Sequence, residues 1–115
     1  MIYKGGCHCG RIKFEVEGNI ESVVECNCSI CKNRGYLLWF VGREQLHLAT
    51  PEADLASYSF NKKVIKHNFC PTCGSGVFGI GTDKTGAAKV AVNVRCLDDI
   101  DLTKLKIMPF DGRSL

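Results

Sequence analysis

Cysteine is the residue type in this chain whose number and spacing most clearly indicate chemistry. The 115 residues include eight cysteines, and seven of these fall in three clusters. The clusters are a C-x-C at Cys7 and Cys9, a C-x-C-x-x-C at Cys26, Cys28 and Cys31, and a C-x-x-C at Cys70 and Cys73. Cysteines at such spacings bind zinc, because a short turn can bring the thiolates to one ion. The sequence therefore predicts metal binding.

The sizes of the clusters suggest how seven thiols are divided between two ions. A structural zinc site is closed by four protein ligands, whereas a catalytic site has three ligands and one open position. The two pairs supply four ligands and the triple supplies three. We therefore expect two zinc ions per chain, one structural at Cys7, Cys9, Cys70 and Cys73, and one open at Cys26, Cys28 and Cys31. Joining the triple to one pair would place five ligands together and leave the other pair without a metal.

Two other interpretations of the clusters receive less support from the sequence. A C-x-x-C is also the spacing of a redox-active pair, but that pair requires a βαβ context, which the pattern does not indicate. A disulfide framework requires an oxidising compartment. The first six residues show neither the apolar core nor the cleavage pattern of a secretory signal, so we expect no signal peptide and a cytoplasmic protein.

The remaining candidate ligands are single residues outside the clusters. The second zinc can also be interpreted as purely structural, in which case one of four side chains would supply its fourth ligand. These are His8, His47, His67 and Cys96. Cys96 shares its parity with Val90, Val92 and Val94, which favours a buried, inert thiol.

Composition and charge exclude several classes of protein. The content of 45% hydrophobic and 23% charged residues is that of a globular chain and not of a disordered one. The formal net charge is +3, but seven thiolates and two Zn²⁺ ions would bring it to about zero, so we expect no nucleic-acid partner. The longest apolar run, 36–41, is far shorter than the ~20 residues of a membrane helix, so we expect no membrane partner.

Strands are the elements expected to position the cysteines. Ile12, Phe14 and Val16 alternate with charged residues across 11–17, as in a half-buried antiparallel strand. Further strands are expected at 22–26, 36–41, 46–48, 55–60, 64–69, 77–80 and 88–94, with 36–41 buried on both faces. Single helical turns are expected at 29–32 and 42–45, while 98–115 is ambiguous. We expect one all-β domain over 1–115, with small, zinc-bound, twisted β-sheets in a sandwich-like arrangement and few or no helices.

The motifs also occur together in an order that resembles a known family. The matching segments are Gly5-Gly6-Cys7-His8-Cys9-Gly10, Phe14-Glu15-Val16, Cys26-Asn27-Cys28-Ser29-Ile30-Cys31, Phe69-Cys70-Pro71-Thr72-Cys73-Gly74-Ser75 and Asn93-Val94-Arg95-Cys96-Leu97-Asp98. From Gly5 to about Asp98 the chain resembles the glutathione-dependent formaldehyde-activating enzyme family, which also includes centromere protein V. The resemblance implies an all-β fold of twisted sheets, shared with a small zinc-binding chaperone of Rab GTPases.

The resemblance further implies a division of roles among the cysteines. The first C-x-C and the late C-x-x-C would bind structural zinc, and Cys26, Cys28 and Cys31 would bind a more labile, catalytic zinc. The implied activity is that of a carbon–sulfur lyase, which interconverts S-hydroxymethylglutathione with formaldehyde and glutathione. The partner would then be a small thiol or thiol adduct.

Residues near the clusters in sequence are candidates for the other roles of such an enzyme. His8 and His67 are candidates for the base, and Lys32, Arg34 and Arg95 for cationic partners of the glutathione carboxylates. The alternative from a different class is a zinc-stabilised binding module without catalysis. Zinc storage or thiol redox buffering is a third hypothesis. The sequence predicts no oligomeric state.

Overall fold

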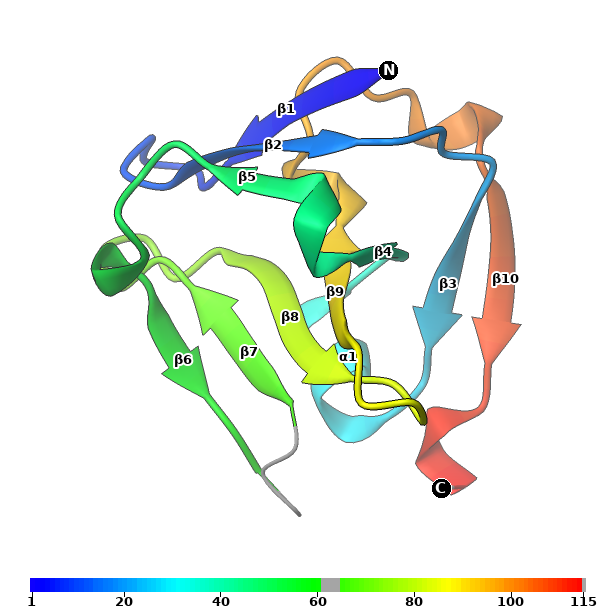
Figure 1. Ribbon diagram of the computed structural model, residues 1–115. Coiled ribbons are helices and arrows are strands. Elements are labelled where there is room, and N and C mark those ends of the chain that lie inside the picture. Colours follow the sequence, from blue (N-terminus) through cyan, green and yellow to red (C-terminus); the bar gives the residue numbers. More distant parts are fainter. Residues whose placement is uncertain (61–64, 115) are drawn as a thin grey trace.

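Two β-sheets form the framework of the computed structural model, which describes residues 1–60 and 65–114 (Figure 1). The smaller sheet has the strand order β1-β2-β5, and the larger has the order β10-β3-β4-β9-β8-β7-β6. The strands are β1 (Ile2–Gly6), β2 (Lys13–Glu17), β3 (Ser22–Cys26), β4 (Leu38–Gly42), β5 (Leu46–Leu48), β6 (Ala56–Tyr58), β7 (Lys66–Phe69), β8 (Gly76–Thr82), β9 (Ala88–Asn93) and β10 (Lys106–Phe110). The predicted all-β, sandwich-like fold is confirmed.

Helical structure is short throughout the described ranges. The α-helix α1 (Ser29–Arg34) contains the helical turn expected at 29–32. The 3₁₀ turns are η1 (Arg43–Gln45), η2 (Glu52–Asp54), η3 (Val94–Cys96), η4 (Leu102–Lys104) and η5 (Gly112–Ser114). Among the residues with assigned positions, no helix has the length and hydropathy needed to cross a bilayer.

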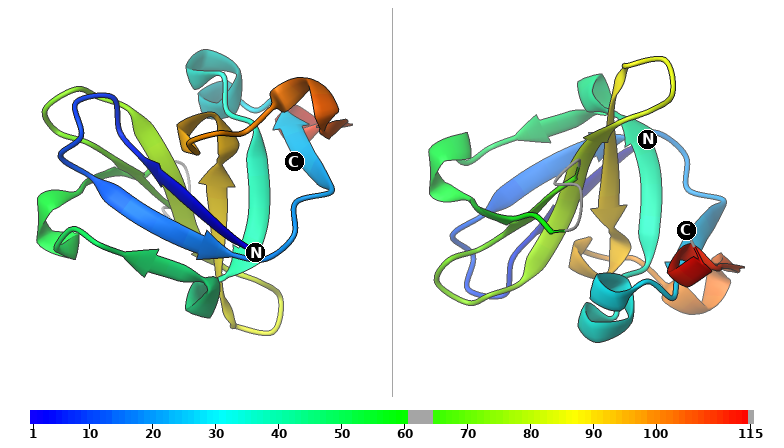
Figure 2. Two further views of the ribbon diagram at one scale, coloured as in Figure 1. Left: turned by 90° about the horizontal axis from the view of Figure 1, so that it is seen from above. Right: turned by 90° about the horizontal axis from the view of Figure 1, so that it is seen from below.

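The main hydrophobic core lies between the two sheets and includes the apolar face predicted for the second strand. Ile12, Phe14 and Val16 are each no more than 1% exposed. Phe14 packs edge-on against Phe78 of β8, with ring centroids 5.7 Å apart. Burial of side chains of this size stabilises a fold by about 1.5–3 kcal/mol each. Figure 2 shows the smaller sheet lying across the larger one, so this packing fixes the two sheets against each other.

Three expectations about strands need correction or completion. The segment expected at 36–41 is buried on both faces except at Phe40, which is 56% exposed, because positions 36 and 38 lie in a second buried cluster and the odd positions lie in the main core. β1 and β10 were not predicted, since β1 ends in two glycines and all five residues of β10 are exposed. Neither strand shows the alternation that marks a half-buried strand. β7 begins at Lys66, and residue 64 of the expected segment lies outside the described residues.

β10 determines the surroundings of the middle cysteine cluster. It pairs in parallel with β3 at the edge of the larger sheet, with Phe110 in register with Cys26. Figure 1 shows the two strands side by side, with the turn after β10 next to the end of β3. The end of β10, which is far from Cys26 in the sequence, is thereby placed beside this first cysteine of the triple.

Candidate metal centres

Two tight turns bring the first and last cysteine clusters together. Cys7 and Cys9 lie in the β1–β2 turn, and Cys70 and Cys73 in the β7–β8 turn. All four sulfurs lie within 4.8 Å of one another. Cys9 Sγ is 3.6 Å from both Cys7 Sγ and Cys70 Sγ. Sulfurs that surround a tetrahedral zinc at about 2.3 Å lie about 3.8 Å apart, so the four-cysteine cluster has the size for one ion.

Backbone amides hold the sulfurs of the four-cysteine cluster in place. The N–H of Thr72 donates to Cys70 Sγ at 3.4 Å, and the N–H of Ile12 donates to Cys7 Sγ at 3.2 Å. Gly74 closes the C-x-x-C turn with a φ of 82°, and its N–H donates to the Cys70 carbonyl at 2.8 Å. This left-handed conformation is easy for glycine and costly for other residues.

The pKa values within the four-cysteine cluster diverge. The Ser75 hydroxyl and the backbone N–H of Ser75 lower the pKa of Cys73 to about 5. The backbone N–H of Arg11 acts to lower the pKa of Cys9, but burial and the neighbouring thiols raise it to about 11. Adjacent thiols therefore share protons, because several thiolates without a counter-charge repel one another. A divalent cation replaces those protons, which is the chemistry of a metal-ligand cluster.

The middle cluster is assembled locally, at the junction of β3 and α1. Cys26 ends β3, Cys28 is the residue that precedes α1, and Cys31 lies in the helix and is buried. Their sulfurs also lie within 4.8 Å of one another. The N–H of Cys28 donates to Cys26 Sγ at 3.4 Å, and Gly35 ends the helix with its N–H on the Cys31 carbonyl.

The three-cysteine cluster shows the same sharing of protons. Burial acts to raise the pKa of Cys28, but hydrogen bonds from the Cys31 backbone and from neighbouring thiols lower it overall. Burial and the Cys28 thiolate raise the pKa of Cys31. The donor set suits zinc, and three sulfurs leave one position of a tetrahedron without a protein ligand.

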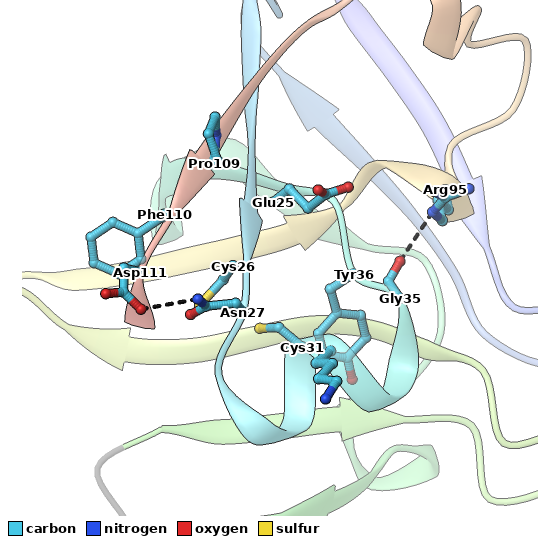
Figure 3. A pocket seen from close by; sticks show the side chains of 11 residues that line it. Glu25, Cys26, Asn27, Cys31, Gly35, Tyr36, Arg95, Pro109, Phe110 and Asp111 are labelled. Carbon is cyan, nitrogen blue, oxygen red and sulfur yellow. Dashed lines mark hydrogen bonds between the residues drawn. The ribbon is translucent and has the colours of Figure 1, made fainter. Parts of the chain in front are cut away.

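A pocket of about 490 Å³ opens beside the three-cysteine cluster. Its lining residues are Glu25, Cys26, Asn27, Cys31, Lys32, Gly35, Tyr36, Arg95, Pro109, Phe110 and Asp111. Figure 3 shows Phe110 and Asp111 on one side of the pocket and Arg95 on the other, with the Arg95 Nε–H donating to the Gly35 carbonyl at 3.0 Å. Two thiols, two cations and two carboxylates thus surround one cavity.

The structure separates the sequence candidates for the other roles into two groups. Lys32 and Arg95 line the pocket, as a carboxylate-binding role requires. Arg34 does not line it and instead donates to the Tyr36 hydroxyl at 3.0 Å, with its guanidinium over the rings of Tyr58 and Phe69. Among the three candidate cations, Arg34 therefore lies outside this pocket.

Neither histidine suggested as a base lines the pocket. His8 lies at the four-cysteine cluster, where its backbone N–H donates to Ser75 Oγ. His67 is buried and stacks on Phe60 and Tyr36, with centroids 5.6 and 6.5 Å apart. Burial and, secondarily, the charge of Arg34 lower the pKa of His67. Neither histidine is therefore placed to act as a base on a molecule in this pocket.

The other candidates for a fourth ligand of the triple also lie elsewhere. His47 Nε2 is 3.1 Å from a carboxylate oxygen of Glu17 on the smaller sheet. Cys96 is partly buried in η3, and burial followed by the charges of Cys7 and Cys73 raises its pKa to about 11. Its thiol therefore lies near the four-cysteine cluster and not at the triple.

Sequence reasoning did not find the pocket residues Glu25, Pro109, Phe110 and Asp111. Glu25 precedes Cys26 and is exposed near the end of β3, so it resembles any solvated charge. The other three come from β10 and the residue after it, whose pairing with β3 has no local signal in the sequence.

Comparisons with known proteins agree with the geometry. Residues 2–110 match the family described as glutathione-dependent formaldehyde-activating enzyme. A protein from Rhodobacter sphaeroides with a crystal structure is 27% identical in sequence to this chain, and the two structures superpose with a TM-score of 0.77. The alignment covers 91% of this chain and 99% of the Rhodobacter chain. The matched residues include the four-cysteine cluster, the three-cysteine cluster and every residue that lines the pocket except Asp111. The chain therefore belongs to the glutathione-dependent formaldehyde-activating enzyme family.

Proposed function

We propose that this protein is a zinc-dependent carbon–sulfur lyase that interconverts S-hydroxymethylglutathione with formaldehyde and glutathione. The observation that carries the proposal is a three-thiol cluster that places two of its cysteines, Cys26 and Cys31, in the wall of a pocket with cations and carboxylates. Four ligands would close the other zinc site, whereas three leave room for a substrate sulfur. A zinc ion held by Cys26, Cys28 and Cys31 would keep a glutathione sulfur in its thiolate form near neutral pH.

The charges of the pocket complement those of glutathione, which has two carboxylates and one ammonium group at neutral pH. Lys32 and Arg95 supply two cations for the carboxylates. Asp111 lies across the pocket from Arg95 and offers a negative charge toward the ammonium group. This arrangement supports a peptide thiol as substrate rather than an uncharged one.

The reaction requires a group that takes and returns a proton. In the cleavage direction, the hydroxyl of the adduct loses its proton, the carbon–oxygen double bond forms, and the carbon–sulfur bond breaks with its electron pair on sulfur. We assign the proton to the Glu25 carboxylate, which lines the pocket and has no ion-pair partner among residues 1–60 and 65–114. In the reverse direction, Glu25 returns the proton to the oxygen of formaldehyde while sulfur attacks the carbon.

NMR exchange spectroscopy of S-hydroxymethylglutathione and free formaldehyde tests the activity. We expect the protein to accelerate the exchange, and Cys28→Ser to abolish the acceleration. Glu25→Gln should lower kcat by roughly 10²–10⁴ with unchanged metal content, as is usual when a general base is lost. Glu21→Gln is the matched control, because this exposed carboxylate precedes the same strand and does not line the pocket. A metal-loaded protein that leaves the exchange at its uncatalysed rate would contradict the proposal and favour a binding module.

Substrate variants test the recognition of the carboxylates. Lys32→Ala should raise KM for the glutathione adduct about fivefold, equivalent to about 1 kcal/mol for one exposed ion pair. KM for the hydroxymethyl adduct of 2-mercaptoethanol, which has no carboxylate, should stay the same. Lys84→Ala in the β8–β9 loop removes the same charge away from the pocket and should affect neither substrate. An equal rise for both adducts would contradict this role of Lys32.

A further inference from the structure

A turn far away in the sequence is fastened to the loop of the three-cysteine cluster through one side chain. The turn comprises 110–114 and is called the latch below, and the side chain is Asn27, between Cys26 and Cys28. The Asn27 Nδ2–H donates to Asp111 Oδ1 at 2.9 Å, and Asn27 Oδ1 accepts from the Arg113 backbone N–H at 2.9 Å. The backbone N–H of Asn27 also donates to the Phe110 carbonyl at 3.2 Å. Both ends of the amide are therefore used on the latch.

The latch is braced internally and lies directly against the cluster. The Ser114 hydroxyl donates to Asp111 Oδ2 at 2.6 Å, so both carboxylate oxygens of Asp111 are engaged. Gly112 faces the cluster so closely that a Cβ at this position would collide with Cys26 Sγ and lie 3.3 Å from Cys28 Cβ. The latch thus covers one side of the Cys26 sulfur, and Figure 3 shows Asp111 beside Asn27 at that edge of the pocket.

We propose that the latch positions the three-cysteine cluster and limits metal loss from it, with Asn27 as the positioning residue. The proposal rests on the metal-binding part of the proposed function and not on the substrate. Hydrogen-bonded groups around a metal's ligands orient those ligands, and their loss weakens metal affinity typically 10–100-fold. In this chain the hydrogen-bonded groups belong to the latch, which also forms part of one wall of the pocket. The same contacts would therefore set the geometry of the open position and the approach to it.

Metal release from the loaded full-length chain tests the proposal without any substrate. Cobalt(II) gives thiolate charge-transfer absorption, which can be followed while an excess of a chelator removes the metal. We expect two phases, a faster one from the three-cysteine cluster and a slower one from the four-cysteine cluster. Asn27→Ala should weaken the binding of cobalt to the three-cysteine cluster about 10–100-fold, which would be seen as more rapid release in the faster phase. The rate of the slower phase should stay unchanged.

Two further variants separate the latch from a local effect at Asn27. Gly112→Ala keeps every polar group of the latch but places a methyl group against Cys26 Sγ. It should therefore also speed the release of cobalt from the three-cysteine cluster. Asp111→Ala removes the partner of Asn27 from outside the cysteine loop and should act in the same direction.

Controls match each of these changes. Ser29→Ala alters the residue on the other side of Cys28, which has no contact with the latch among the hydrogen bonds of the described residues. Asp101→Ala removes a similar turn-capping carboxylate, which accepts from Thr103 in η4 before β10. Both controls should release cobalt as the unaltered protein does.

The outcomes distinguish the latch from the catalytic proposal. Release from the three-cysteine cluster that is unchanged in folded Gly112→Ala and Asp111→Ala proteins would overturn the latch, even if Asn27→Ala failed to fold. Faster release in these variants would support the latch even if the unaltered protein did not accelerate formaldehyde exchange. An unaltered protein that binds metal only at the four-cysteine cluster would overturn both proposals.

Discussion

The two clusters should differ in how strongly metal binding is coupled to folding, and a pair of serine variants tests this difference. Cys73→Ser removes a ligand from the cluster that joins two turns, in which Cys9 and Cys70 are 61 positions apart. Cys28→Ser removes a ligand from residues 26–31, which already lie in one strand end and one helix. We expect Cys73→Ser to be the more destabilising change. Burial alone predicts the opposite order, since Cys73 is exposed and Cys28 is partly buried.

Loop closure gives the magnitude of the expected difference. The entropy lost when two points of a chain are joined grows as the logarithm of their separation. For separations of 61 and five positions the difference is about 2 kcal/mol in the free energy of unfolding. With a urea m-value of about 2 kcal/mol/M, the midpoint of Cys73→Ser should lie about 1 M below that of Cys28→Ser.

Urea unfolding followed by circular dichroism measures this gap in zinc-loaded samples. The same measurement after complete removal of zinc is the control, because without metal neither cluster links its segments. The gap should then disappear. The reasoning is refuted if Cys28→Ser unfolds at the same or a lower urea concentration, or if the gap survives removal of the metal.

Three further predictions concern metal content, pH and packing. Elemental analysis of protein prepared without chelator should give two zinc ions per chain, and one or none would contradict the division of the cysteines. Burial lowers the pKa of His67, so below pH 6.5 the unfolded chain binds the proton more readily than the folded chain does. The free energy of unfolding should therefore decrease as the pH is lowered, until His67 is also protonated in the folded protein. The drop in urea midpoint between pH 7.5 and 5.5 should therefore be smaller in His67→Phe, and an equal drop would argue against this. Gly5→Ala should cost about 1–3 kcal/mol in urea unfolding, because its Cβ would lie 2.7 Å from the Cys96 carbonyl oxygen, whereas exposed Lys4→Ala should change little.

The sequence was informative wherever ligand chemistry or a simple periodicity constrains the answer. Counting ligands was enough to group the seven cysteines as the structure groups them, because four and three are the numbers that zinc sites use. The alternation of Ile12, Phe14 and Val16 predicted β2, since a strand with one buried face must alternate. Both inferences depend only on chemistry and period.

The sequence was uninformative where a residue's role comes from pairing with a distant segment. β10 is exposed along its length and shows no apolar face, yet it brings Phe110 and Asp111 to the pocket by pairing with β3. Nearness in sequence suggested His8 and His67 as bases, but β-sheet topology places them at the other cluster and under an aromatic stack. Cross-strand neighbours carry no mark in the local pattern, so only the fold could separate Arg34 from Lys32 and Arg95.

The difference in lability that the family implies for the two sites has a topological explanation in this chain. Both clusters consist of thiols alone, so ligand softness cannot distinguish them. The four-cysteine cluster joins turns that are distant in sequence, and loss of its metal would release a constraint on the whole sandwich. The three-cysteine cluster joins only residues 26–31, so loss of its metal would require local opening and not global unfolding. Under the proposed function, the site that would admit and release a thiol with each turnover thus lies where a change of ligand disturbs the least structure.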